Sequence, residues 1–204
     1  MRYVKDHKDR TRKRIVERAS RGLRQKGANG LSVVALMKLA ALTHGGFYSH
    51  FASRDALVVE AFATAMDKTV SRWMQLTRAV PADKRFDAIV VAYLSGRHRD
   101  DQAHGCVLPS LAADIGRSTK KARSTFEKKL QAMIEMVAYQ LPNKSPDAAR
   151  QIATSAIATM MGSIVLARAV GNDRFSGDIL QAGRTAIRTH ADGETGNARP
   201  TNEH

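Results

Sequence analysis

The nonapeptide from Thr43 to Phe51, THGGFYSHF, concentrates hydrogen-bonding side chains around two adjacent glycines. At the start of a short helix, a hydroxyl and an imidazole can add hydrogen bonds to an anion that the first backbone N–H groups already attract. Tyr48 and His50 can also donate to phosphate oxygens. Gly45 and Gly46 allow a close approach of the backbone, at about 1 kcal/mol each in lost helix propensity. This combination predicts a phosphate-contacting surface.

The positive charge of the chain is concentrated in the same region. The 204 residues carry a formal net charge of +14, and residues 1–54 hold 13 Lys and Arg against 3 Asp and Glu. The remaining residues are close to balance. A basic segment of this kind favours a polyanionic partner, either nucleic acid or an anionic membrane surface. We therefore expect an N-terminal polyanion-binding module attached to a nearly neutral body.

Apolar residues at helical spacing predict the elements that position this surface. Ile15, Ala19 and Leu23 recur every four residues, which indicates an amphipathic helix over 10–26. Ser32 is a plausible N-cap for a second, short helix, and Phe47 with Phe51 would anchor a third. Two short helices joined by a turn of three or four residues and braced by an earlier helix form a helix-turn-helix unit, at about residues 32–51.

The rest of the chain reads as further helices, so the expected fold class is all-α. A long helix is expected from the Ser53 cap to about Arg78, and aromatic residues make up only 5% of the chain. We expect a flexible basic arm (1–9), a DNA-binding domain (10–54), a helical body (55–190) and a disordered tail (191–204). In such a unit the second helix of the motif enters the major groove of DNA.

Other classes of protein are less consistent with the sequence. The single cysteine, Cys106, excludes an intramolecular disulfide, and without a signal peptide or a span of about 20 apolar residues we expect a cytoplasmic protein that does not cross a membrane. No nucleotide-binding or hydrolase motif indicates an enzyme or a cofactor. His98, His104 and Cys106 could be considered as metal ligands, but the sequence has no second cysteine to complete such a site, so we expect no bound metal. The alternative function is a non-specific, nucleoid-like or membrane-surface helical protein.

The segment from Leu31 to Phe62, LSVVALMKLAALTHGGFYSHFASRDALVVEAF, resembles the DNA-binding signature of the TetR/AcrR family of transcriptional regulators. The resemblance implies that Thr43, Tyr48 and His50 contact DNA phosphates. It also implies that the backbone at Gly45 and Gly46 approaches DNA closely. Arg54 stands where a basic residue commonly follows the Ser cap in the family. Ser32 and His44 complete the predicted DNA-binding set. Ala41 departs from the family, in which a glycine usually stands in the turn.

The same resemblance implies a homodimer that binds an inverted-repeat operator and, most often, a repressor that a small-molecule effector releases. The candidate effector-pocket residues are Trp73, Met74, Phe86, Tyr93, Cys106, Leu108, Phe126, Met133 and Met160. The candidate dimer-interface residues are Ile152, Ala156, Ser163, Ala167, Ile179, Gly183, Ala186 and Ile187. Plain core packing is the alternative for both sets. Cys106 could sense oxidants at a helix start, or could simply be a small buried side chain.

Overall fold

A computed structural model describes residues 2–27, 32–40 and 44–193 of the chain. Over these residues the chain forms ten α-helices and one short 3₁₀ helix, with no β-strand, which confirms the expected all-α fold. Contacts divide it into two compact units, Met1–Arg72 with Asp100–Met133 and Trp73–Arg99 with Ile134–His204. Residues 10–54, the expected DNA-binding domain, thus form part of the first, larger unit. The first division between the compact units falls after Arg72, not after residue 54.

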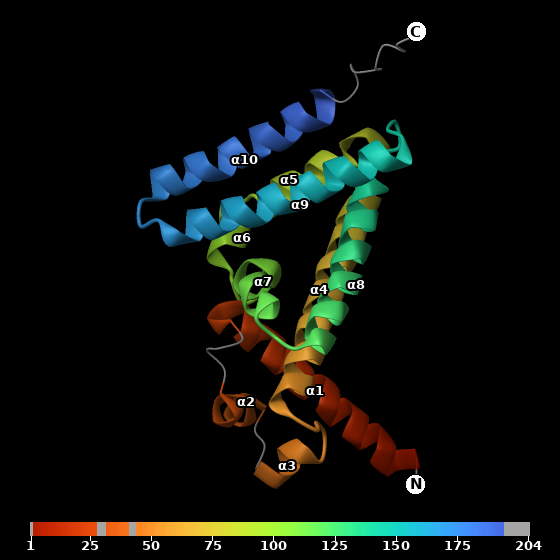
Figure 1. Cartoon of the computed structure of the whole chain (residues 1–204), viewed down its shortest axis with the longest axis vertical. Helices are drawn as coiled ribbons and strands as arrows, with labels where there is room; N and C mark the ends of the chain where they lie inside the picture. Colours follow the sequence, from red (N-terminus) through yellow and green to blue (C-terminus); the bar gives the residue numbers. More distant parts are fainter. Residues whose placement is uncertain (1, 28–31, 41–43, 194–204) are drawn as a thin grey trace. The chain divides into compact units, whose positions relative to one another are not determined.

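The first unit contains the N-terminal helices and the segments that brace them (Figure 1). Its helices are α1 (Arg2–Lys26), α2 (Val33–Ala40), α3 (His44–Tyr48), most of α4 (Arg54–Arg78), α7 (Leu108–Gly116) and the start of α8 (Lys120–Ala138). Ile15 and Leu23 of α1 and Leu57 and Met66 of α4 are fully buried, as their helical spacing predicts. The Ser20 hydroxyl of α1 donates to the Ala61 carbonyl of α4 at 2.7 Å.

The N-terminal arm differs from the expectation. Helix α1 begins at Arg2, so residues 2–9 are helical rather than a flexible arm. These residues contain no glycine or proline, and the Lys and Arg among them have good helix propensity. Nothing in the sequence therefore prevents the helix from beginning before residue 10. The predicted tail begins inside α10, and from residue 194 onward it lies outside the described residues.

The C-terminus of α1 lies close against α7. Gly27 has a φ of +67° and its N–H donates to the Leu23 carbonyl at 2.9 Å, which is the usual left-handed helix end. A Cβ at Gly27 would lie 3.1 Å from the Asp114 carboxylate and 3.2 Å from the Ser110 carbonyl. The Ser110 hydroxyl donates to the Arg24 carbonyl at 2.6 Å. Glycine is therefore required here by both conformation and space.

The second unit is built around two long helices. It holds the end of α4, the 3₁₀ helix Ala82–Lys84, α5 (Arg85–Tyr93), α6 (Gly96–Asp100), the end of α8, α9 (Pro146–Ala169) and α10 (Asp173–Gly193). Helices α9 and α10 lie side by side in opposite directions (Figure 1). A Cβ at Gly183 of α10 would lie 2.4 Å from Ser163 Oγ, so the helices approach each other at a position where only hydrogen fits.

Helix α9 is long and largely apolar. By length and composition alone it could cross a membrane, and it is the one such helix among the described residues. Its buried face, which includes Ile152, Ala156, Met160 and Ile164, packs within the chain against α10 and α5. The core of the unit therefore accounts for the apolar residues on this buried face of α9.

Candidate nucleic-acid interface

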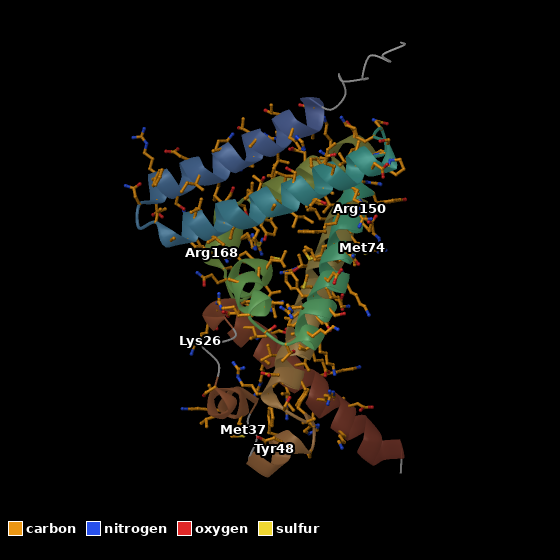
Figure 2. All side chains as sticks on the ribbon, in the orientation of Figure 1. Lys26, Met37, Tyr48, Met74, Arg150 and Arg168 are labelled. Atoms are coloured by element: carbon orange, nitrogen blue, oxygen red, sulfur yellow. The ribbon has the colours of Figure 1, made fainter. Side chains whose placement is uncertain are left out.

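The two short helices of the predicted motif form where the sequence places them. The Ser32 hydroxyl accepts from the Ala35 N–H at 3.1 Å, so it caps α2 as expected. Met37 turns from α2 into the core and is buried (Figure 2). Helix α3 begins at His44 and is five residues long, shorter than the segment expected to reach Phe51. Thr43 and the side chain of His44 lie outside the described residues, so their predicted DNA contacts stay predictions.

The three aromatic residues of this region are divided between the core and the surface. Phe47 is fully buried and Phe51 is 2% exposed, with their ring centroids 5.8 Å apart. Tyr48 is 50% exposed and meets the Phe47 ring edge-on, with centroids 5.2 Å apart (Figure 2). Tyr48 therefore has the exposure that a phosphate contact requires, while the two phenylalanines hold α3 to the unit.

The turn after α3 brings His50 partly into the protein. The N–H groups of His50 and Phe51 donate to the Phe47 carbonyl at 2.9 and 3.0 Å, and the Ser49 hydroxyl donates to the Gly46 carbonyl at 2.7 Å. The His50 ring is half-buried beside the Phe51 ring. The His50 side chain is less exposed than that of Tyr48, so we expect His50 to contribute less to phosphate binding.

The next helix starts beside this turn. The Ser53 hydroxyl accepts from the Ala56 N–H at 3.1 Å, which confirms Ser53 as the cap of α4. The Arg54 guanidinium lies 3.3 Å from the Asp55 carboxylate in the first turn of that helix. Arg54 is thus at the surface next to the motif, and a phosphate would compete with Asp55 for it.

Arg12 of α1 is the residue that sequence reasoning missed. Its Nε donates to Glu60 Oε1 of α4 at 3.1 Å, its Nη2 donates to Glu60 Oε2, and its Nη1 donates to the His50 carbonyl. The guanidinium carbon lies 4.2 Å from the centroid of the Phe51 ring. One side chain thereby joins α1, α4 and the turn that follows α3.

The charged groups of Glu17 and Arg24 have a perturbed pKa. A hydrogen bond from Lys68 lowers the pKa of the Glu17 carboxyl, and this ion pair joins α1 to α4 as the pair of Arg12 and Glu60 does. Burial lowers the pKa of Arg24, whose Nη1 lies 3.5 Å from the Ala103 carbonyl.

The candidate effector residues are divided between the two units. Trp73 and Tyr93 come together in the second unit, with ring centroids 6.1 Å apart, and Phe126 packs against Phe62 in the first at 6.3 Å. Met74 is 45% exposed and so does not belong to a buried pocket wall (Figure 2). Cys106 is buried and stands two residues before the start of α7, and its role as a sensor stays a prediction.

Two pockets among the described residues contain none of the nine candidates. The first, of about 600 Å³, lies in the second unit around Arg85, Tyr139 and Lys144. The other, of about 420 Å³, lies in the first unit between the start of α4 and the turn that joins α7 to α8. Residue type and helical spacing predict burial but do not locate a cavity.

The candidate dimer residues are mostly buried inside one chain. Ile152, Ala156, Ser163, Ala167, Gly183 and Ile187 are inaccessible in the single subunit. Their stripes close the α9–α10 core, which was the alternative interpretation of the sequence. Ile179 is half-buried and Ala186 is exposed. The exposed apolar side chains of these helices are instead Val165, Leu166 and Phe175.

Comparison with known proteins agrees with this architecture. Residues 15–61, which span the motif, match the family model described as bacterial regulatory proteins, tetR family. No curated protein matches the chain. A TetR-family regulator from Cytophaga hutchinsonii superposes with a TM-score of 0.74 at 21% identity, covering 89% of this chain and 95% of that one.

Two further solved structures share the fold. A TetR regulator from Chloroflexus aurantiacus J-10-FL gives a TM-score of 0.75 at 22% identity over 94% of this chain and 98% of that chain. The reduced form of NemR from E. coli gives a TM-score of 0.71 at 19% identity over 88% and 95%. The N-terminal unit thus contains a helix-turn-helix DNA-binding motif on an all-α scaffold. Residues 15–61 thus match the tetR family of bacterial regulatory proteins, and the chain shares the fold of solved TetR-family regulators.

Proposed function

We propose that the protein is a sequence-specific DNA-binding regulator, a repressor as is most common in this family, that acts in the cytoplasm by binding rather than by catalysis. The observation that carries the proposal is the division of aromatic residues on α3. Tyr48 is exposed while Phe47 and Phe51 are buried, so the short helix presents a hydrogen-bonding face beside a basic segment. The DNA-binding set is Ser32, Thr43, His44, Gly45, Gly46, Tyr48, His50 and Arg54.

The protein acts as a homodimer on an inverted repeat in this proposal. Val165, Leu166 and Phe175 support it, because they leave apolar surface on α9 and α10 that the single chain does not cover. The dimer face is therefore assigned to these side chains with Ile179 and Ala186. Leu166→Asp should produce monomers in sedimentation, whereas Ser124→Asp at an exposed position of α8 should leave the dimer intact.

Release by a small-molecule effector is the second part of the proposal. The contact of Ser110 with the Arg24 carbonyl joins α7 to the end of α1, so a shift of α7 would reach the DNA-binding helices. A tenfold loss of DNA affinity needs only about 1.4 kcal/mol of differential effector binding between the two states. Genes next to the coding sequence would suggest which compounds to test.

Selection of bound duplexes from a random pool tests the DNA-binding proposal. A specific regulator should enrich one inverted repeat and should keep its preference for that duplex over competitor DNA as salt rises. A non-specific basic protein should bind all duplexes with equal affinity and lose all of them together with salt. The second result would reject the proposal in favour of the nucleoid-like alternative.

A further inference from the structure

We propose that Arg12 is a positioning residue for the recognition helix α3, and that it sets sequence discrimination without contacting a base. This inference rests on the proposed DNA-binding function. It is carried by the placement of one guanidinium between α1, the Glu60 carboxylate of α4, the Phe51 ring and the His50 carbonyl.

Helix α3 needs such support because it is short. It spans the five residues His44–Tyr48, two of them glycines, and an isolated helix of this length is unstable in water. Among its described side chains only Phe47 is buried, and Phe51 follows in the next turn. Two aromatic rings can hold α3 against the core, but they do not by themselves fix its rotation about the axis through those rings.

The contacts of Arg12 supply the missing constraint. The fork to Glu60 fixes the guanidinium plane, because two N–H groups meet two carboxylate oxygens in parallel. The remaining Nη1 donates to the His50 carbonyl in the turn that follows α3. The face of the same guanidinium covers the Phe51 ring at 4.2 Å. The Arg12 guanidinium thus contacts the turn after α3 both at the His50 carbonyl and at the Phe51 ring. Glu60 of α4 fixes the position of that guanidinium.

Lysine cannot replace these contacts. An ammonium group has no planar fork, so it can pair with Glu60 or reach the His50 carbonyl but does not fix both in one geometry. Arg12→Lys therefore keeps the positive charge that attracts phosphates and removes the alignment. Arg12→Gln removes both.

The chain offers a matched control. Lys68 of α4 pairs with Glu17 of α1, so this ion pair joins the same two helices and involves none of the residues of α3 or its turn. Lys68→Gln and Arg12→Gln each remove one positive charge and one ion pair between α1 and α4. Any difference between the two variants reports the contacts of Arg12 with His50 and Phe51.

The experiment compares the full-length wild type, Arg12→Gln, Arg12→Lys and Lys68→Gln in two measurements. The first is amide hydrogen exchange of residues 44–51 without DNA. The second is affinity for the duplex selected from the random pool and for unselected random-sequence duplexes. Thermal unfolding confirms that each variant is folded under the conditions used.

The expected result separates the variants. Both Arg12 variants should exchange the amides of His50 and Phe51 at least about tenfold faster, while Lys68→Gln matches the wild type. Arg12→Lys should bind the selected duplex about tenfold more weakly, which corresponds to losing one charge-assisted hydrogen bond, and should bind random duplexes as the wild type does. Lys68→Gln should lower both affinities by a similar, small factor.

Two results would overturn the inference. Equal exchange in Arg12→Gln and Lys68→Gln would show that Arg12 does not hold α3. Equal loss of selected and random binding in Arg12→Lys, with unchanged exchange, would make Arg12 an ordinary phosphate contact. If the wild type prefers no duplex, the proposed function fails and the claim about discrimination fails with it. The exchange measurement still decides independently whether Arg12 orders α3.

Discussion

The DNA-binding helices and the α9–α10 pair are stabilised in different ways. Helices α9 and α10 have 24 and 21 residues and approach closely enough that Gly183 faces Ser163 with no room for a methyl group. Helices α2 and α3 have 8 and 5 residues and depend on a few large anchors and charged braces. A long helix pair distributes its stability over many small contacts, whereas the DNA-binding region concentrates its stability in single side chains.

The largest expected effect comes from removing the aromatic anchor of α3. Phe47→Ala should destabilise the DNA-binding helices by about 3–5 kcal/mol, because it leaves a cavity where a fully buried ring stood. Amide exchange should accelerate throughout α1, α2 and α3 and stay unchanged in α9 and α10. Equal acceleration of amide exchange in both regions would show that they unfold as one, and would contradict the view that they are stabilised in different ways.

A smaller loss is expected when the close approach of α9 and α10 is disturbed. Gly183→Ala should lower the free energy of unfolding by about 1–3 kcal/mol in urea titrations, because its Cβ would overlap Ser163 Oγ. Gly177→Ala is the control on the same helix, because its Cβ meets no atom within 4 Å. That change should be neutral or stabilising by up to about 1 kcal/mol. Equal effects at the two glycines would show that α9 and α10 are not tightly packed there.

The third prediction separates stability from DNA binding. Tyr48→Phe should weaken binding to all duplexes by on the order of 1 kcal/mol, because it deletes one phosphate hydrogen bond. The thermal midpoint should not change, since Tyr48 is exposed. If the variant melts early and binds DNA normally per folded molecule, Tyr48 belongs to the core and the division of the aromatic residues is wrong.

The smallest effect concerns the second brace between α1 and α4. Because Lys68 lowers the pKa of Glu17 below its ordinary value near 4.5, this ion pair stabilises the fold above that pH and loses its effect as pH falls through the folded pKa. Glu17→Gln should cost less than about 1 kcal/mol at neutral pH, as expected for a partly exposed pair. The difference should disappear in acid.

A double-mutant cycle with Lys68→Gln measures this coupling directly. Urea titrations at neutral and acidic pH give the coupling free energy at each pH. A coupling that grows as pH falls would have the wrong sign and would show that Lys68 does not stabilise the charged form of Glu17.

The sequence predicted the local features of the fold well. Ser32 and Ser53 cap the helices that follow them, and Phe47 and Phe51 are buried one turn apart, because capping and helical spacing depend on neighbouring residues. The break between α5 and α6, which falls at Leu94 and Ser95, is a different case. Tertiary packing decides such a break, so residue spacing did not reveal it.

Long-range pairing explains what sequence reasoning missed. Arg12 is one of several arginines on a basic helix, and its partners lie 38 and 48 residues away, so no local pattern distinguishes it from Arg10 or Arg14. The apolar stripes of α9 and α10 correctly indicated buried faces. A stripe does not specify its partner, and the faces assigned to a second subunit proved to pack within one chain.

The ring pair of Trp73 and Tyr93 gives the chain an internal optical probe. Trp73 is the only tryptophan in the sequence, is almost fully buried, and lies with its ring centroid 6.1 Å from that of Tyr93. Its emission spectrum and quenching therefore depend on one place in the second unit. Candidate effectors that enter or rearrange that place can be screened by intrinsic fluorescence on the unlabelled protein, before any operator sequence is known.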